Sequence, residues 1–192
     1  MKDNNYLGDD KCPDDNNWLK GKILSLYDRE IAPYLIEHAQ IVLRTDVLDD
    51  ILLDWCDALS EVWNRIPNLW QYEDEILSIL GGYEEYWPKL MNEEEKEIYN
   101  QLPEQITIYR YTATPGEKPG LCWALSRRDA KILNKEHGEC LPRVLTSCEI
   151  SKNKVIAIKS SRFPCEVLAD VSASSVKEIG GLFLKFLRKP RS

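Results

Sequence analysis

The repeat of apolar residues changes at Pro103, and this change most constrains the fold. From Trp18 to about Asn100, apolar side chains recur at spacings of three and four residues, which is typical of helices that bury one face. After Pro103 they alternate, and Gln105–Ala113 is rich in the β-branched and aromatic residues that favour strands. The sequence therefore predicts an α+β protein, with a helical N-terminal region followed by a mainly β C-terminal region.

Three parts follow from this pattern: an acidic, flexible arm at residues 1–16, a helical region at 17–101 and a β domain at 102–192. The arm is rich in Asp and Asn, and only Tyr6 and Leu7 are apolar anchors. The helical region contains five of the six tryptophans, which we interpret as core residues in preference to a binding face. These tryptophans are Trp18, Trp55, Trp63, Trp70 and Trp87.

The expected elements can be given as ranges. The helices are Leu19–Tyr27, Ile31–Leu43, a segment between a Thr45 cap and Pro67, Leu69–Leu80 and Asn92–Leu102. The strands are Gln105–Ala113, Leu121–Leu125, Arg143–Ile150, Val155–Lys159 and Glu166–Val171, with Val176–Ile179 and Leu182–Leu187 as additional candidates. One further helix interrupts the strands, because Ser126 and Asp129 match a capping box and Gly138 is placed to end it.

Charge divides the chain in the same way. The first 100 residues carry 23 acidic and 9 basic side chains, whereas the remaining residues carry 9 acidic and 16 basic ones. A basic C-terminal half suits a polyanionic ligand such as a dinucleotide, RNA or DNA. The alternative is that the two halves complement one another electrostatically.

Several classes of protein are disfavoured. The chain has no apolar run of about 18 residues, which a membrane span requires, and no apolar leader, so we expect a cytoplasmic protein without membrane contact. The six cysteines form no CxxC pair and only two histidines are present, so we expect free thiols and no metal site. His137 and Cys140 are close in sequence but are a weak candidate for a nucleophile and its base.

Arg110 is the first candidate for chemistry. In a strand it shares a face with Ile106 and Ile108, so it is expected to point inward. A buried guanidinium needs an anionic partner, because an unpaired buried charge is costly. A bound phosphate, held by the planar fork of the side chain, meets this need. The alternative is a structural salt bridge, for example to a strand carboxylate, which the residue taken by itself favours.

Glu166 is the second candidate. Its neighbours Cys165, Val167 and Leu168 carry no charge, so the carboxylate either pairs with a cation or takes part in acid/base or electrostatic chemistry. Exposure on an edge strand is the alternative. The third candidate segment, Pro119–Ala130, joins a short strand to a capped helix and either offers backbone N–H groups to a ligand or is an ordinary connection.

Taken in order, these segments resemble the ADP-ribosyltransferase pattern known as R-S-E, in its small prokaryotic and phage branch. The resemblance covers about residues 94–170. Leu102–Arg110 is similar to the branch's opening strand with its Tyr-Arg, and Gly120–Leu125 to its Gly-Leu-Ser-Trp-Thr-Leu segment. Ala130 lies where the helix alanine is expected, and Cys165–Leu168 resembles the strand that carries the essential Glu.

The resemblance implies a split β-sandwich that binds NAD, as a substrate and without a metal, and transfers ADP-ribose as a toxin or effector does. Arg110 would hold a phosphate of the NAD, and Cys122, with the main chain at Trp123 and Ala124, would replace the hydroxyl motif. Glu166 would be the catalytic residue, stabilising the transition state as nicotinamide leaves. The aromatic rings of Tyr109, Tyr111 and Trp123 are candidates to stack on the nicotinamide.

Three departures from the family pattern leave alternatives open. Tyr111 replaces the usual Gly, Cys122 and Ala124 replace two hydroxyl residues, and Pro164 stands where arginine-modifying members carry Glu. The alternatives to a transferase are an NAD glycohydrolase and a catalytically inactive interaction module. The expected partner is a protein or nucleic acid acceptor, and the acidic helical half is a further candidate surface for a target or neutralising partner.

Overall fold

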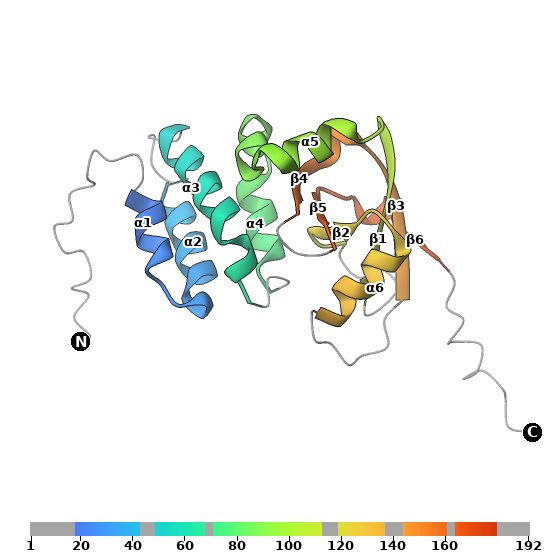
Figure 1. Ribbon diagram of the computed structural model, residues 1–192, viewed down its shortest axis with the longest axis horizontal. Coiled ribbons are helices and arrows are strands. Elements are labelled where there is room, and N and C mark those ends of the chain that lie inside the picture. Colours follow the sequence, from blue (N-terminus) through green and yellow to red (C-terminus); the bar gives the residue numbers. More distant parts are fainter. Residues whose placement is uncertain are drawn as a thin grey trace, which may run out of the picture.

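The computed structural model describes residues 18–42, 49–67, 71–112, 119–136, 144–160 and 164–179. Helices fill the N-terminal part and strands the C-terminal part, so the predicted α+β class is confirmed. In Figure 1 the first four helices lie at one end of the molecule and the strands at the other, with α5 crossing above the sheet and α6 below it. The helices are α1 (Trp18–Leu24), α2 (Asp28–Val42), α3 (Asp49–Val62), α4 (Glu73–Leu80), α5 (Glu93–Gln101) and α6 (Arg127–Glu136).

Several helix boundaries differ from the sequence prediction: α1 ends at Leu24 and not at Tyr27, and α2 begins at Asp28 and not at Ile31. The α3 helix ends at Val62 and tightens into the 3-10 turn η1 (Trp63–Arg65) before Pro67 is reached. The α4 helix begins at Glu73 and not at Leu69, because Tyr72 has a non-helical backbone and three acidic residues fill the first turn, where negative charge is stabilising. The Thr45 cap and residues 68–70 lie outside the described residues.

A 3-10 segment, η3 (Glu84–Leu90), was not expected from the sequence. It contains Pro88, which cannot donate the backbone hydrogen bond that an α-helix requires. Its Trp87 and Leu90 side chains are nevertheless buried. The α5 helix that follows is capped at Asn92, whose side chain and that of Glu95 bond reciprocally to each other's backbone N–H groups.

The strands form one antiparallel sheet in the order β4-β5-β2-β1-β3-β6. They are β1 (Gln105–Thr112), β2 (Cys122–Ala124), β3 (Val144–Ser151), β4 (Val155–Lys159), β5 (Glu166–Ala169) and β6 (Lys177–Glu178). The short 3-10 turns η4 (Lys152–Lys154) and η5 (Ala173–Ser175) precede β4 and β6. The candidate strand Leu182–Leu187 and the helix end at Gly138 lie outside the described residues.

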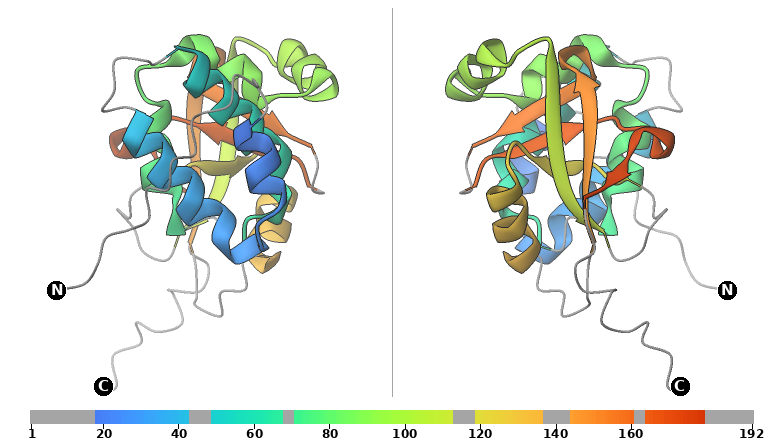
Figure 2. Two further views of the ribbon diagram at one scale, coloured as in Figure 1. Left: turned by 90° about the vertical axis from the view of Figure 1, so that its left-hand side faces the viewer. Right: turned by 90° about the vertical axis from the view of Figure 1, so that its right-hand side faces the viewer.

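The backbone pairing between neighbouring strands is shortest in the middle of the sheet, between β1 and β2. The β1 and β3 strands pair along their whole length, from Gln105 with Ser151 to Thr112 with Val144. In contrast, β1 meets β2 at the single pair of Tyr109 with Ala124. In Figure 2, the strands β4, β5 and β2 lie crosswise to the strands β1 and β3. The sheet therefore consists of two three-stranded halves that meet at one pair of residues.

The helical part and the sheet share one continuous apolar core. Trp55, Trp63 and Trp87 are buried in it, which confirms the core interpretation for these three tryptophans. The side chains of Trp18 and Trp70 are not among the described ones. A smaller cluster lies under α6, where Ala130 and Leu133 pack against β1 and β2. The Ser126 cap of α6 is confirmed by its hydrogen bonds to Asp129.

No helix in the described part of the chain is both long and apolar enough to span a bilayer.

Candidate functional site

Arg110 points to the helical side of the sheet, as its place in the alternating pattern predicts. Ile106 and Ile108, which share its face of β1, are buried. The guanidinium donates to Glu73 through two nitrogens, with Nη1 2.7 Å from Oε1 and Nη2 2.8 Å from Oε2. Nη1 also donates to the carbonyl of Cys122 at 3.0 Å. Arg110 thus has an anionic partner within the chain, and that partner belongs to helix α4.

The Glu73 carboxylate is almost completely enclosed, with 5% of the residue exposed. Its Oε1 also accepts the backbone N–H of Cys122 at 3.2 Å. Glu73 is the first residue of α4, where the partial positive charge of the helix end favours a carboxylate. Two guanidinium N–H groups and one backbone N–H therefore converge on a single anion.

Gly120 makes this arrangement possible. Its φ of +70° is in the left-handed region that favours glycine. A Cβ atom at this position would overlap both the Glu73 carboxylate and the Arg110 guanidinium. We call the combination of the Arg110 fork, the Cys122 N–H and the Cβ-free Gly120 the anion cradle.

The β2 residues of the predicted site lie inside the protein. Cys122, Trp123 and Ala124 are all buried, and the Trp123 indole donates to the Gly120 carbonyl at 3.1 Å. Burial, followed by the charges of Glu73 and Glu166, raises the pKa of the Cys122 thiol well above its ordinary value. Cys122 is therefore a neutral thiol and a poor nucleophile in this conformation.

Glu166 is 1% exposed and begins β5, an inner strand between β4 and β2. The alternative that placed it on an exposed edge is therefore wrong. Its Oε2 accepts a hydrogen bond of 2.8 Å from the indole N–H of Trp63, in η1. In the sheet, Glu166 pairs with Ala124, which in turn pairs with Tyr109. Three residues on adjacent strands are thus in register: Tyr109 on β1, which is next to Arg110, Ala124 on β2 and Glu166 on β5.

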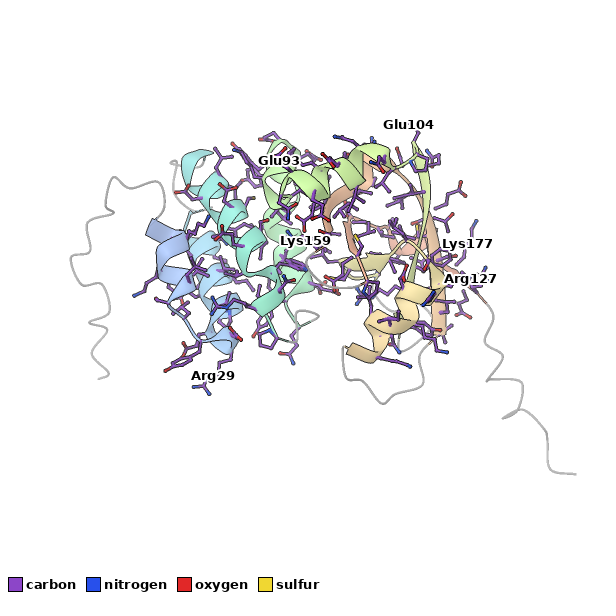
Figure 3. The ribbon with its side chains drawn as sticks, viewed as in Figure 1. Arg29, Glu93, Glu104, Arg127, Lys159 and Lys177 are labelled. Carbon is purple, nitrogen blue, oxygen red and sulfur yellow. The ribbon has the colours of Figure 1, made fainter. Side chains whose placement is uncertain are left out.

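A buried ion pair lies beside Glu166. Lys159 pairs with Glu166 in the β4–β5 ladder, and its ammonium is 3.0 Å from Oε2 of Glu95. The ammonium also donates to the Leu90 carbonyl at 2.8 Å and to the hydroxyl of Ser60 at 3.1 Å. Burial lowers the pKa of Lys159, and Glu95 opposes this effect. Figure 3 shows Lys159 in the middle of the molecule, between the helical part and the strands.

Tyr109 and Tyr111 are not brought together with the Arg110 guanidinium. Both are half-buried and pack on the cluster under α6, since residues next to Arg110 in a strand point to the other face. The Arg127 guanidinium lies over the Tyr109 ring at 5.8 Å from its centroid. Of the candidate residues, the structure therefore brings Arg110 and Glu166 near Cys122, whereas Ala124 packs with the two tyrosines in the cluster under α6.

A cavity of about 250 Å³ lies elsewhere, between η3, α5 and β4. Trp87, Met91, Tyr99, Val155 and Ile156 supply its apolar lining. It includes neither Arg110 nor Glu166.

Metal-binding clusters of His, Cys, Asp and Glu are not found within the described ranges. The His137 and Cys140 pair lies outside them.

The sequence interpretation missed the two residues from the helical half that contact the site. Glu73 stands in a run of three acidic residues and resembles a solvent-facing side chain. Trp63 follows the apolar period of its helix and was assigned to the core alone. Nothing in the local pattern distinguishes either residue, because both contacts join segments that are distant in the chain.

Comparison with known proteins identifies no relative of this chain. No protein-family model matches the chain, no curated protein is detectably similar to it, and no solved structure matches its fold.

Proposed function

We propose that this protein is an NAD-dependent ADP-ribosyltransferase that acts on a macromolecular acceptor. The observation that carries the proposal is the register Tyr109–Ala124–Glu166. The three segments that resemble the family pattern are far apart in sequence, yet they occupy the adjacent strands β1, β2 and β5. The division of the sheet into two halves joined at one pair supports the split β-sandwich that the resemblance implies.

The anion cradle supports a phosphate-binding role for Arg110. Its donors converge on two carboxylate oxygens, and a phosphate presents oxygens that the same guanidinium fork binds. Gly120 leaves space for the anion, so the donor set fits a phosphate of a dinucleotide. In this proposal Arg110 and the Cys122 N–H hold and orient NAD.

Glu166 is the proposed catalytic residue. The bond between nicotinamide and the ribose breaks, nicotinamide leaves with the electron pair, and the acceptor adds to the same carbon and loses a proton to solvent. A carboxylate near the ribose stabilises the positive charge that develops in the transition state. The Trp63 N–H occupies Oε2 of this carboxylate and orients it.

The test is incubation of the purified protein with labelled NAD, with and without cell lysate, following nicotinamide release and label transfer. Glu166→Gln is expected to slow release on the order of 100-fold, since it removes the charge that opposes the developing cation. Glu149→Gln, at an exposed position on β3, is the matched control and should leave the rate unchanged. The labelled species names the acceptor, and free ADP-ribose alone would identify a glycohydrolase.

A second candidate is a non-enzymatic interaction module. It is favoured by the burial of Glu166 and by the engagement of Arg110 with Glu73, since both charged groups are bound within the chain. Absence of NAD binding together with absence of nicotinamide release, with and without lysate, would contradict the transferase and support this module.

A further inference from the structure

We propose that Glu73 is a built-in competitor for the phosphate of NAD: its carboxylate occupies the anion cradle and must leave before the dinucleotide binds. This inference rests on the proposed function and concerns the regulation of the same site. In this proposal the helical half covers the NAD site, and the protein is inactive while Glu73 occupies the anion cradle.

The first step of the argument is chemical equivalence. A carboxylate and a phosphate monoanion each offer two oxygens to the guanidinium fork, so Arg110 cannot bind both in this geometry. Both donors of the fork face Glu73, at 2.7 and 2.8 Å, and the Cys122 N–H is directed at the same carboxylate. A phosphate that uses these donors therefore displaces Glu73.

The second step is steric. Gly120 borders the cradle so closely that even a Cβ atom at this position would overlap the Glu73 carboxylate and the Arg110 guanidinium. Only 6% of the Glu73 side chain is exposed, so the oxygens that would compete with a phosphate are enclosed while Glu73 remains in place.

The third step concerns how the cover is attached. Glu73 belongs to α4 and Trp63 to η1, which precedes α4 in the chain. These elements bind the two charged residues of the proposed site, Arg110 and Glu166 respectively. Displacement of α4 would free the Arg110 fork for a phosphate, while the Trp63 N–H, on η1, keeps its bond to Glu166 and continues to orient that carboxylate.

Binding in such a system follows the fraction of molecules that are open. The apparent dissociation constant equals the intrinsic one divided by that fraction, so any change that weakens the Glu73–Arg110 pair tightens the binding of NAD. Glu73→Gln removes the negative charge and keeps the size of the side chain. Glu75→Gln removes the same charge from an exposed position of the same helix and is the matched control.

The experiment measures binding of inorganic pyrophosphate and of NAD by calorimetry, together with nicotinamide release, for the full chain and both variants. We expect Glu73→Gln to bind both ligands on the order of tenfold more tightly than the unmodified protein and Glu75→Gln, with faster release. Equal or weaker binding would overturn the inference, since it would mean that Glu73 only orients Arg110.

The two readouts separate the inference from the proposed function. Tighter pyrophosphate binding without nicotinamide release in any variant would support the cradle competitor and contradict the transferase. Release that is abolished by Glu166→Gln but unaffected by Glu73→Gln would support the transferase and overturn the competitor.

A second measurement uses the unmodified protein, in case Glu73→Gln fails to fold. Saturating pyrophosphate should accelerate hydrogen exchange of the α4 amides, residues 73–80, because the ligand displaces the helix from the cradle. The α5 amides are the internal reference. Unchanged or slower exchange in α4 with pyrophosphate bound would overturn the inference.

Discussion

The carboxylate of Glu73 and the guanidinium of Arg110 face each other through two hydrogen bonds of 2.7 and 2.8 Å, joining helix α4 to strand β1 across 37 positions of sequence. The pair is largely enclosed, with 18% of the Arg110 side chain and 6% of the Glu73 side chain exposed. It connects the acidic helical half to the basic β half at the proposed site. Here one acidic side chain from the helical half contacts one basic side chain from the β half, as the electrostatic alternative expects.

A substitution at Gly120 tests whether the Glu73–Arg110 ion pair requires the absence of a Cβ atom at this position. Gly120→Ala adds a Cβ that overlaps both members of the ion pair, in addition to the cost of a left-handed backbone. Gly82→Ala has the same backbone cost at φ +91°, but its Cβ meets nothing within 4 Å. We expect a loss of about 1–2 kcal/mol in the free energy of unfolding for Gly82→Ala and about 3 kcal/mol or more for Gly120→Ala. Urea denaturation measures both, and equal losses would contradict the steric role of Gly120.

A substitution of Lys159 tests how much the buried Lys159–Glu95 ion pair contributes to stability. Lys159→Met leaves the fully buried Glu95 without its cation, which typically costs about 3–5 kcal/mol. Lys96→Met removes the cation of a neighbouring pair whose carboxylate side chain, on Glu93, is 89% exposed, and should cost less than about 1 kcal/mol. The comparison is made by urea denaturation. Similar effects of the two substitutions would contradict a larger cost of leaving the buried Glu95 unpaired.

Trp63 tests the hydrogen bond to Glu166. Trp63→Phe deprives a buried carboxylate of one donor, with an expected cost of about 1–3 kcal/mol beyond the lost packing. Trp87→Phe removes a comparable indole whose N–H bonds a neutral carbonyl of Leu80 at 3.1 Å, where the expected cost of the bond is about 0.5–1.5 kcal/mol. Thermal and urea unfolding should therefore show the larger loss at Trp63. A larger loss for Trp87→Phe would argue against a charge-assisted bond at Glu166.

A substitution of His38 tests how the stability of the protein depends on pH. Burial lowers the pKa of His38 below its usual 6.5, so the unfolded chain binds the proton more readily than the folded one. Stability is therefore expected to fall as the pH is lowered from 6.5 through the folded-state pKa, and to recover as the pH rises again. His38→Phe, which retains a ring beside Tyr34, should lose less stability than the unmodified protein over this range. His137→Gln is the control for the other histidine, and an unfolding curve of His38→Phe with the original pH dependence would contradict the assignment.

Local patterns were sufficient for the class and for most elements of the fold. The change of period at Pro103 placed the helices before the strands, because amphipathic repeats depend on residues that are neighbours in sequence. The errors occurred at element ends and at one short 3-10 segment. The α4 helix begins later than expected, and the 3-10 segment η3 was missed because its period differs from that of an α-helix and it contains Pro88.

The sequence by itself determined that Arg110 points inward and that its charge needs a partner, because strand alternation and the cost of an unpaired buried cation are local properties. Only the tertiary structure decided that the partner is Glu73, and that Trp63 binds Glu166. Glu73, Asp74 and Glu75 are alike in sequence, but only the first is buried, where it pairs with Arg110 of β1. Which of several equivalent side chains is enclosed depends on contacts between distant segments, and these form only when the helical half packs on the sheet.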